Sequence, residues 1–382
     1  MSAGRTTSRA GYEHDWTGRC GVPRGGEVLL SLRRLDALGP IDLATLQVEA
    51  GAGVTLAALQ AHARAAGLDA AVDFGARDAC TAGVRALRHG TVRARIAGLE
   101  AVLADGTVVD RMAGLLKDNA GYALPALLIG SEGTLGLVTR VRWRLVPRLP
   151  ARVAALVPLP SLAAATELLA ALRPALASLE AADFFLDDGL ELVLNHLGLA
   201  APVQPRAPAY VLLECAAADD PTAALAEALD GRDAIVADGT MERERLWRLR
   251  EAHAEAIAAA GIPHKLDVGV PLHRLAAFAD AARAAVAATV PHARVILFGH
   301  LGDGNVHVNV LGADPGDDAV DEAVLRAAVG HGGTISAEHG VGAAKARWLH
   351  LVRAPGELRA MAAVKRALDP AGLLNPGAVL LP

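Results

Sequence analysis

Apolar and polar residues repeat along this 382-residue chain with two different periods. In the first half, short apolar or alternating runs predict strands at 28–32, 46–50, 96–103, 108–109 and 137–145. The third and fourth runs flank an Asp-Gly turn and therefore predict a hairpin. Apolar residues at helical spacing predict a helix at 56–66.

The pattern changes across residues 147–160, which predict a domain boundary. Beyond it we expect strands at 153–157, 182–186, 210–215 and 234–237, with helices at 162–172 and 221–230. Pro174 should stop or kink the first of these helices. The repeated strand-helix-strand order favours a ferredoxin-like antiparallel sheet with helices on one face. The fold class is therefore predicted to be α+β.

The last third of the chain continues this mixture. A helix is expected at 240–260 with Thr240 as its N-cap. Further helices are expected at 272–290, 317–329 and 357–368, and strands at 264–271, 295–298 and 306–311. The predicted domains are 12–147, a substrate or cap domain at 151–330, and a C-terminal segment at 331–382 that returns to the first domain.

Composition and charge exclude several classes of protein. The net charge is −5 with no long basic run, so nucleic acid is not an expected partner. No apolar run reaches 18 residues, so no membrane span is expected. Cys20, Cys80 and Cys215 are too dispersed for a disulfide framework or a zinc ribbon. Together with the absence of a signal-like N-terminus, this predicts a cytoplasmic protein.

The segment 298–310, Phe-Gly-His-Leu-Gly-Asp-Gly-Asn-Val-His-Val-Asn-Val, is the most informative stretch. The sequence Gly-Asp-Gly-Asn, between two apolar strands, favours a hairpin turn. His307 and Asn309 are two positions apart and therefore point to the same face of their strand. His300 ends the preceding strand beside that face. Burial of a polar cluster between apolar strands costs free energy unless its polar groups have partners.

A second polar turn, Ser-Ala-Glu-His-Gly at 336–340, offers Glu338 and His339. Two imidazoles, His300 and His307, with the Glu338 carboxylate form a plausible divalent metal site with positions open for substrate. His339 would lie beside the metal as a general base. The alternative is a hydrogen-bonded hairpin with a purely structural role.

Three ordered motifs resemble a known family. They are Gly-His-x-Gly-Asp-Gly-Asn-x-His-x-Asn from 299, Ser-x-Glu-His-Gly-x-Gly from 336, and Leu-Asp-Pro-x-Gly-x-Leu-Asn-Pro-Gly from 368. Together they are similar to the C-terminal half of the FAD-linked D-2-hydroxyacid dehydrogenases of the vanillyl-alcohol oxidase superfamily. The resemblance implies a PCMH-type FAD-binding domain followed by an FAD-linked oxidase C-terminal domain.

The resemblance also implies an activity, the oxidation of a D-2-hydroxy acid such as lactate, glycolate or 2-hydroxyglutarate to the 2-oxo acid. Arg250 and Lys265 would hold the substrate carboxylate, Asn309 would orient the substrate and His339 would take the hydroxyl proton. The hydride would pass to flavin N5, with zinc or manganese activating the alcohol. Ala254 stands where relatives that bind a dicarboxylic acid can offer a hydroxyl, which argues against a 2-hydroxyglutarate-like substrate.

The cofactor-binding residues implied by the resemblance lie in glycine-rich turns of the first half. They are Arg24, Gly25, Gly26, Lys117, Asp118, Gly130, Ser131, Glu132, Gly133, Thr134 and Gly136, joined by Asn375 near the C-terminus. The chain is shorter than the family pattern after Arg19, after Gly26 and after Gly83. Each missing loop would have supplied hydrogen bonds to FAD, so weakened FAD binding is expected.

Two alternatives therefore stay open beside the dehydrogenase. One is an FAD-deficient pseudoenzyme or metal-binding subunit with the same fold. The other is a flavin-free metal-dependent hydrolase or lyase. For the dehydrogenase, the electron acceptor would be a quinone, a cytochrome or a flavoprotein, and a homodimer is possible.

Overall fold

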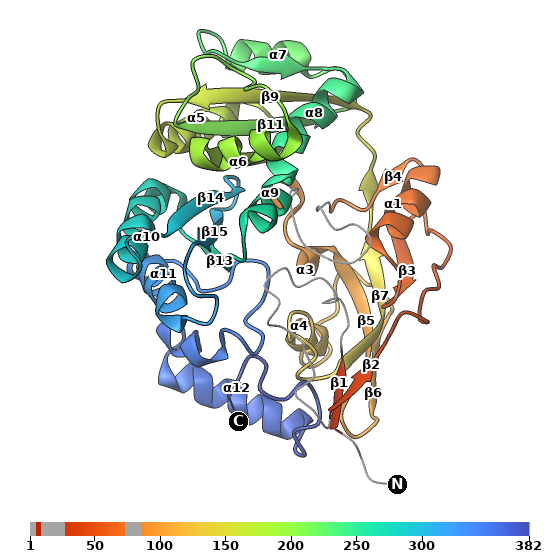
Figure 1. Cartoon of the computed structure of the whole chain (residues 1–382). Helices are drawn as coiled ribbons and strands as arrows, with labels where there is room; N and C mark the ends of the chain where they lie inside the picture. Colours follow the sequence, from red (N-terminus) through yellow and green to blue (C-terminus); the bar gives the residue numbers. More distant parts are fainter. Residues whose placement is uncertain (1–4, 9–26, 73–85, 382) are drawn as a thin grey trace. The chain divides into compact units, whose positions relative to one another are not determined.

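The computed structural model describes residues 5–8, 27–72 and 86–381 (Figure 1). The chain divides into two compact units. The first comprises 1–83, 89–148 and 339–382, and the second comprises 84–88 and 149–338. Each unit has its own sheet and its own core.

The first unit is built on a four-stranded antiparallel sheet. Its order is β3 (Gln47–Gly51), β7 (Leu137–Arg144), β5 (Ile96–Val102) and β6 (Val108–Arg111). The predicted hairpin at 96–109 is confirmed as the β5–β6 pair. Helix α1 (Leu56–Ala65) starts at Thr55, whose hydroxyl accepts a hydrogen bond from the Ala58 N–H. Its buried face packs with Trp143 of β7 in one apolar cluster.

Short elements complete the first unit. Strand β1 (Arg5–Ser8) runs parallel to β2 (Glu27–Leu30), and β4 (Leu68–Asp69) pairs with β8 (Val146–Pro147). The helical pieces are α3 (Val92–Arg95), α4 (Leu124–Leu128), η2 (Ala346–Leu351) and α12 (Pro355–Leu368). A single turn, α2 (Ala86–His89), spans the sequence boundary between the units.

The second unit is built on a seven-stranded sheet in which all neighbouring strands are antiparallel. Its order is β12 (Ile235–Ala237), β9 (Ala151–Leu159), β11 (Ala209–Ala217), β10 (Leu179–Leu186), β14 (Arg294–His300), β15 (Asn305–Leu311) and β13 (His264–Gly269). The strands predicted beyond residue 150 are all present, most of them longer than predicted.

Helices cover both faces of this sheet, so the expectation of helices on one face is wrong. One group packs with Phe185, Tyr210 and Phe298 in a single core; it comprises α6 (Asp187–Leu197), α8 (Thr240–Glu251) and α9 (His253–Ala260). The other group comprises α5 (Leu162–Ala175), α10 (Leu275–Thr289) and α11 (Asp318–Gly330). The remaining pieces are α7 (Thr222–Ala228) and η1 (Leu272–Arg274).

Several helix boundaries differ from the predictions for local reasons. The predicted helix 240–260 is two helices that meet at Ala252, and its N-cap is Gly239 rather than Thr240. Helix α5 continues one residue past Pro174 before it ends. Helix α6 was not predicted, although Gly198 ends it in the left-handed conformation that favours glycine. Among the described residues, no helix combines the length and apolarity that a membrane crossing requires.

Candidate functional site

The strand register of the second unit gathers polar side chains on one face of the sheet. Asp183 of β10 lies opposite His300 of β14, which lies opposite Asn305 of β15. On β15 and β13, His307 lies opposite Asp267. Directly paired residues point to the same side of a sheet. Residues more than a hundred positions apart therefore share one face, the same face on which α6, α8 and α9 pack.

The turn at 301–304 that connects β14 and β15 is the predicted hairpin turn. Gly304 has φ of +78°, and a Cβ there would collide with the carbonyl oxygen of Val270. A side chain at this position would be both strained and crowded. The glycine thus lets β13 approach the hairpin and brings Asp267 next to His307.

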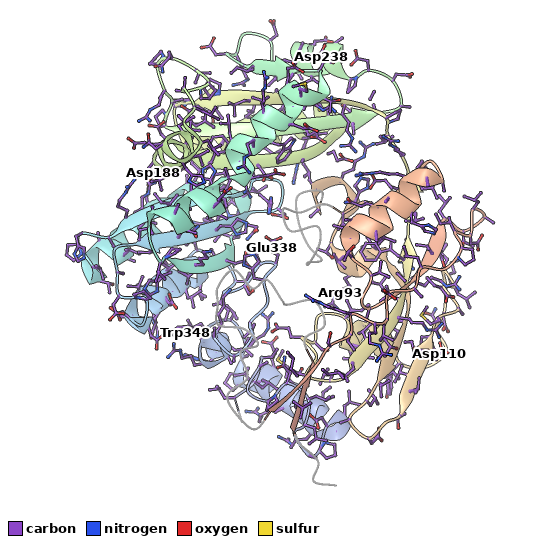
Figure 2. The ribbon with its side chains drawn as sticks, turned by 45° about the vertical axis from the view of Figure 1, so that its right-hand side comes forward. Arg93, Asp110, Asp188, Asp238, Glu338 and Trp348 are labelled. Atoms are coloured by element: carbon purple, nitrogen blue, oxygen red, sulfur yellow. The ribbon has the colours of Figure 1, made fainter. Side chains whose placement is uncertain are left out.

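Glu338 enters the site from the turn that follows α11. Thr334 forms a β-bridge with Gly269, and this bridge ties the start of the turn to the end of β13. Asp267 then accepts hydrogen bonds from the backbone N–H groups of Ala337 and Glu338, at 3.0 and 2.8 Å. Glu338, which is labelled in Figure 2, is thereby held with its carboxylate near the His307 ring.

The two predicted imidazole ligands converge on one carboxylate oxygen. His307 Nε2 lies 3.5 Å and His300 Nε2 lies 3.7 Å from Glu338 Oε1. Ligand atoms of a tetrahedral zinc ion are separated by about 3.4 Å, given bonds of about 2.1 Å. The donor set and its spacing therefore fit a divalent metal.

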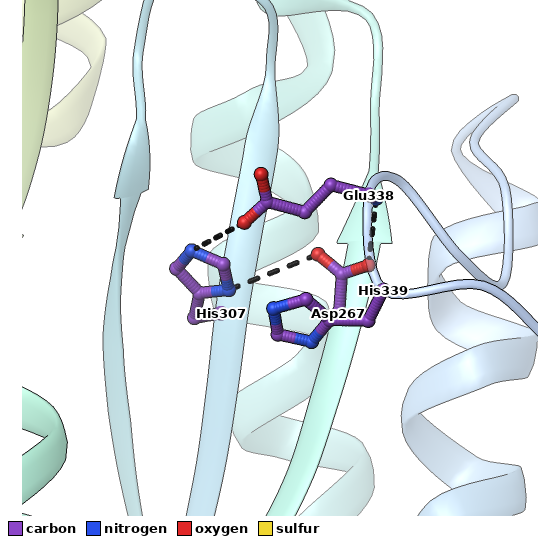
Figure 3. A group of neighbouring side chains, drawn as sticks. All are labelled: Asp267, His307, Glu338 and His339. Carbon is purple, nitrogen blue, oxygen red and sulfur yellow. Dashed lines mark hydrogen bonds and ion pairs between the residues drawn. The ribbon is translucent and has the colours of Figure 1, made fainter. Parts of the chain in front are cut away.

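A second group of potential ligand atoms includes Asp267, to which sequence reasoning assigned no role. Suitable atoms of Asp267, His307, Glu338 and His339 all lie within 4.8 Å of one another (Figure 3). His300 is outside this group, but it approaches the same oxygen of Glu338. His339 directly follows Glu338 in the chain, and its ring lies beside the other members.

Asp267 is better understood as a support for the ligands than as a ligand. One oxygen accepts a 2.6 Å hydrogen bond from Asn305 Nδ2, and the other accepts the two turn amides. Its contact with His307 Nδ1 is longer, at 3.7 Å. A carboxylate that already accepts three hydrogen bonds orients its neighbours, as is usual around metal ligands.

Opposite charges shift the protonation of the buried groups. Burial alone would lower the pKa of His300, but the Asp183 charge and the hydrogen bonds to Asp183 and Glu338 raise it well above its ordinary value. Burial alone would raise the pKa of Glu338, but the hydrogen bond and charge of His300 hold it well below its ordinary value. In the absence of a metal, the positive charge of the protonated His300 ring therefore compensates the negative charges of the Asp183 and Glu338 carboxylates.

The two predicted cations for the substrate acid occupy different places. Arg250 on α8 is 8% exposed; its Nε lies 2.9 Å from Asp183 Oδ2, and its guanidinium stacks 4.6 Å above the centre of the Phe298 ring. Lys265 on β13 is half-buried and lies opposite Asn309 on β15. Asn309 is 4% exposed, and its side-chain amide has no hydrogen-bond partner among the described residues.

A neutral histidine lies behind Arg250. His253 is fully buried between the rings of Phe185 and Phe298. Burial, reinforced by the charge of Arg250, lowers the pKa of His253 to about 3. Its Nδ1 contacts the Arg250 carbonyl oxygen at 3.1 Å, and its Nε2 has no partner within the described chain. His253 therefore supports Arg250 by packing and carries no charge.

The glycine-rich turn 130–136 of the first unit is tied to the C-terminal segment. Glu132 accepts hydrogen bonds from the Val341 and Gly342 amides, both at 2.7 Å, and its own carbonyl accepts one from Asn375 Nδ2. Glu132 and Asn375 both adopt positive φ, a strained conformation that these bonds hold. The amide of Gly133 donates no hydrogen bond among the described residues, so this rigid turn fits contact with a cofactor oxygen.

The other predicted cofactor residues give less information. Asp118 pairs with Arg111 at 2.6 Å, and Lys117 is exposed. Thr134 is buried, with its hydroxyl bonded to the Ser131 carbonyl oxygen. Arg24, Gly25 and Gly26 lie outside the described residues, as do Cys20 and Cys80; Cys215 is buried and free.

The structure brings His300, His307 and Glu338 together, with Asn309 and Lys265 on the same sheet face. Sequence reasoning missed three supporting residues, namely Asp183, Asp267 and Asn305. Asp267 left a signal, because it lies two positions after Lys265 on an alternating strand and therefore shares its face. No sequence pattern pointed to Asp183, since its partners are more than 60 residues away along the chain.

Comparison with known proteins gives a consistent assignment. The family model described as the C-terminal domain of FAD linked oxidases matches residues 148–379, and the model of an FAD binding domain matches residues 4–111. The chain is 37% identical to a D-2-hydroxyglutarate dehydrogenase of Xanthomonas citri pv. viticola, over 94% of this chain and 82% of that protein. It is 36% identical to the mitochondrial D-2-hydroxyglutarate dehydrogenase of Bos taurus, over 85% of this chain but 63% of that protein.

Solved structures show the same fold at low identity. The 4-ethylphenol oxidase from Gulosibacter chungangensis has a TM-score of 0.69 at 17% identity, covering 98% of this chain and 84% of its own. A p-cresol methylhydroxylase has a TM-score of 0.67 at 14% identity, covering 93% and 80%. The predicted fold, a PCMH-type FAD-binding domain with an FAD-linked oxidase C-terminal domain, is confirmed.

Proposed function

Because the chain belongs to the FAD-linked D-2-hydroxyacid dehydrogenase family, we propose that it oxidises a D-2-hydroxy acid to the 2-oxo acid, using FAD and a divalent metal. The observation that carries the proposal is the approach of His300 and His307 to a single oxygen of Glu338. This donor set lies on the same sheet face as Lys265 and Asn309.

The substrate carboxylate is assigned to Arg250 and Lys265. Arg250 is held through its Nε, which leaves the two terminal nitrogens of the guanidinium for a bidentate contact. Lys265 supplies a second positive charge from β13. Two cations from different elements would select an acid over a neutral alcohol and fix its orientation.

Asn309 supplies the polar contact that orients the substrate. Its amide is almost completely buried, and it lacks a hydrogen-bond partner among the described residues. Its amide can both donate and accept hydrogen bonds, and it lies on the same sheet face as His307, which supports a ligand-facing role for Asn309.

The chemistry is divided between the chain and its cofactors. His300, His307 and Glu338 would hold the metal, zinc or manganese, while His339 takes the proton of the substrate hydroxyl as general base. When bound, the metal would supply Lewis acidity at the hydroxyl group and FAD would accept the two electrons of the oxidation. His339 is adjacent in the chain to Glu338, so the base and the ligand are positioned by one turn.

The choice among D-2-hydroxy acids is a finer proposal. The Xanthomonas and bovine relatives are named for D-2-hydroxyglutarate, which makes this dicarboxylic acid the first substrate to try. Ala254 on α9 offers no hydroxyl to a second carboxylate. We therefore keep D-lactate and glycolate beside D-2-hydroxyglutarate as candidate substrates.

The test combines a spectrum with an assay. The purified protein should show the near-UV and blue absorption bands of bound flavin, either as isolated or after addition of FAD. Under anaerobic conditions and without an added acceptor, the D-isomers of a panel of 2-hydroxy acids should bleach those bands and the L-isomers should not; an artificial electron acceptor should then restore the bands and be reduced itself. A protein that binds no flavin after reconstitution, or reduces it equally with both isomers, would refute the proposal.

A second candidate is a metal-binding protein of the same fold without FAD. It is favoured by the three places at which the first half of the chain is shorter than the family pattern. Absence of flavin with stoichiometric metal would support it, and metal-dependent hydrolysis or elimination would point to the flavin-free hydrolase or lyase.

The electron acceptor, the oligomeric state and the cellular location of the enzyme are predictions. The electron acceptor is expected to be a quinone, a cytochrome or a flavoprotein, and a homodimer is possible. A cytoplasmic location also stays a prediction, since the bovine relative is a mitochondrial protein.

A further inference from the structure

Asp183 is a buried carboxylate that contacts two residues of different predicted function. It lies near the middle of β10 and is 0% exposed. Its Oδ1 is 2.9 Å from His300 Nδ1, and its Oδ2 is 2.9 Å from Arg250 Nε. A buried charge persists only where its partners compensate the loss of water. His300 is a proposed metal ligand, and Arg250 is proposed to bind the substrate carboxylate.

We propose that Asp183 is a positioning residue that fixes the metal-ligating face of His300 and the carboxylate-binding face of Arg250 relative to each other. The inference rests on the proposed function, because it assigns a role in that same site. It adds a residue that contacts neither metal nor substrate and acts through two residues that do.

On the histidine side, the hydrogen bond selects which ring nitrogen is available. His300 Nδ1 donates its proton to Asp183, so Nε2 is the nitrogen that offers a lone pair to a metal. Nε2 is also the atom that faces Glu338 Oε1, at 3.7 Å. A carboxylate behind a ligating histidine fixes the tautomer and the ring orientation, as in other metal sites.

On the arginine side, the ion pair holds one edge of the guanidinium. The contact with Asp183 is made through Nε, and the flat face of the group rests on the Phe298 ring. Among the described residues, the Arg250 side chain forms no other ion pair or ring contact. Rotation of the guanidinium is therefore restrained on two sides, and its terminal nitrogens remain available for a carboxylate.

The same domain contains a pair that serves as a structural counterpart. Asp321 of α11 contacts His264 Nδ1 at 2.7 Å, while His264 Nε2 contacts the Asp314 carbonyl oxygen at 2.7 Å. Both nitrogens of His264 are thus used within the fold. His264 alternates with Lys265 on β13 and points to the opposite face of the sheet. The pair therefore offers a matched control in which an aspartate holds a histidine that faces no ligand.

The experiment compares Asp183→Asn with Asp321→Asn in the full-length protein. Co²⁺ is titrated into metal-free protein and its binding is followed by its visible absorption bands. Competition with Zn²⁺ then gives the affinity of the site for Zn²⁺. KM and kcat are measured separately for the preferred hydroxy acid. Asp183→Asn should weaken Co²⁺ binding about 10- to 100-fold. It should also raise KM, and the rise should be smaller in an Arg250→Lys background because the two residues act through one contact. Asp321→Asn should change neither quantity more than about threefold.

The outcomes separate this inference from the proposed function. If the wild-type protein binds no Co²⁺ and turns over no hydroxy acid, both fail together. If the wild type does both and a folded Asp183→Asn variant is unchanged, the positioning role alone is refuted. Should the variant not fold, ¹⁵N spectra of histidine-labelled, Zn²⁺-loaded wild type decide the matter. They should show His300 protonated at Nδ1 and metal-bound at Nε2, and ligation through Nδ1 would overturn the inference.

Discussion

The carboxylate of Asp267 accepts a 2.8 Å hydrogen bond from the backbone N–H of Glu338, 71 residues further along the chain. The same oxygen accepts the Ala337 amide, so one strand residue fixes the turn that presents a predicted metal ligand. The other oxygen holds Asn305 at the start of β15. Strand β13, the hairpin and the Glu338 turn are thus joined at one buried carboxylate, which is 0% exposed.

Replacing Asp267 by Asn should loosen this junction. The variant keeps the shape of the side chain but replaces one accepting oxygen by a donor, so at least one buried N–H loses its partner. We expect the free energy of unfolding to fall by about 1.5–3 kcal/mol, the usual value of a hydrogen bond to a charged group. Urea unfolding measures the loss. Asp238→Asn, at an exposed position after β12, should change stability by less than about 0.5 kcal/mol. Equal stabilities for the two variants would contradict the role given to Asp267.

His307→Ala should remove metal binding while leaving the fold intact. The ring is one of two imidazoles near Glu338 Oε1, and two remaining donors seldom retain zinc against a chelator. Metal analysis after gel filtration should show stoichiometric metal in the wild type and little in the variant. The exposed His292 provides the control, because its ring contacts the Gly312 carbonyl oxygen in a surface turn away from the proposed site. Loss of metal from His292→Ala, or retention by His307→Ala, would argue against this site.

His339→Ala should abolish turnover with little change in metal content. A general base contributes about 10²- to 10⁴-fold to the rate, and the three predicted ligands are untouched by this change. Rapid-mixing measurements of flavin reduction, together with metal analysis, separate the two effects. His350→Ala, at an exposed residue bonded to the Arg347 carbonyl oxygen, is the matched control. Near-normal reduction by the His339 variant would remove this residue from the mechanism.

Glu132→Gln should weaken flavin retention through the glycine-rich turn. The carboxylate accepts the Val341 and Gly342 amides with separate oxygens, and glutamine can accept only one of them. The turn holds Glu132 at positive φ, so it should relax once that bond is lost. We expect a lower ratio of flavin to protein after dialysis, measured from the absorbance spectrum. An exposed glutamate on α7 offers the comparison Glu227→Gln, which should retain flavin like the wild type.

The parts of the site that could be predicted are those that local chemistry specifies. The sequence Gly-Asp-Gly-Asn is typical of a hairpin turn, and alternation along β15 places His307 and Asn309 on one face of the sheet. The order of strands in the sheet is a long-range property. β10 pairs with β14 across more than a hundred residues, and only that pairing brings Asp183 to His300. No local pattern around Asp183 marks it, because its strand is buried throughout and lacks alternation.

Helix positions show the same division between local and tertiary information. Amphipathic spacing located α10 and α11, but it did not show that α8 and α9 separate at Ala252. That break places Arg250 at the end of one helix and His253 at the start of the next. His253 and Arg250 then contact Phe185 and Phe298, which come from strands that are distant in sequence.

His253 should make the protein less stable at acidic pH. Its folded-state pKa of about 3 lies below the unfolded value of about 6.5, so the unfolded chain binds the proton first as the pH falls. Stability is therefore complete above pH 6.5 and declines between about pH 6.5 and 3, by about 2 kcal/mol at pH 5 relative to pH 7. His253→Gln removes the titrating ring and should flatten this part of the profile, although it lowers stability at pH 7 through lost packing. Urea unfolding of the two proteins at pH 7 and pH 5 measures the difference, with His292→Gln as the exposed control. A variant that loses as much stability as the wild type between these pH values would show that His253 is not the group responsible.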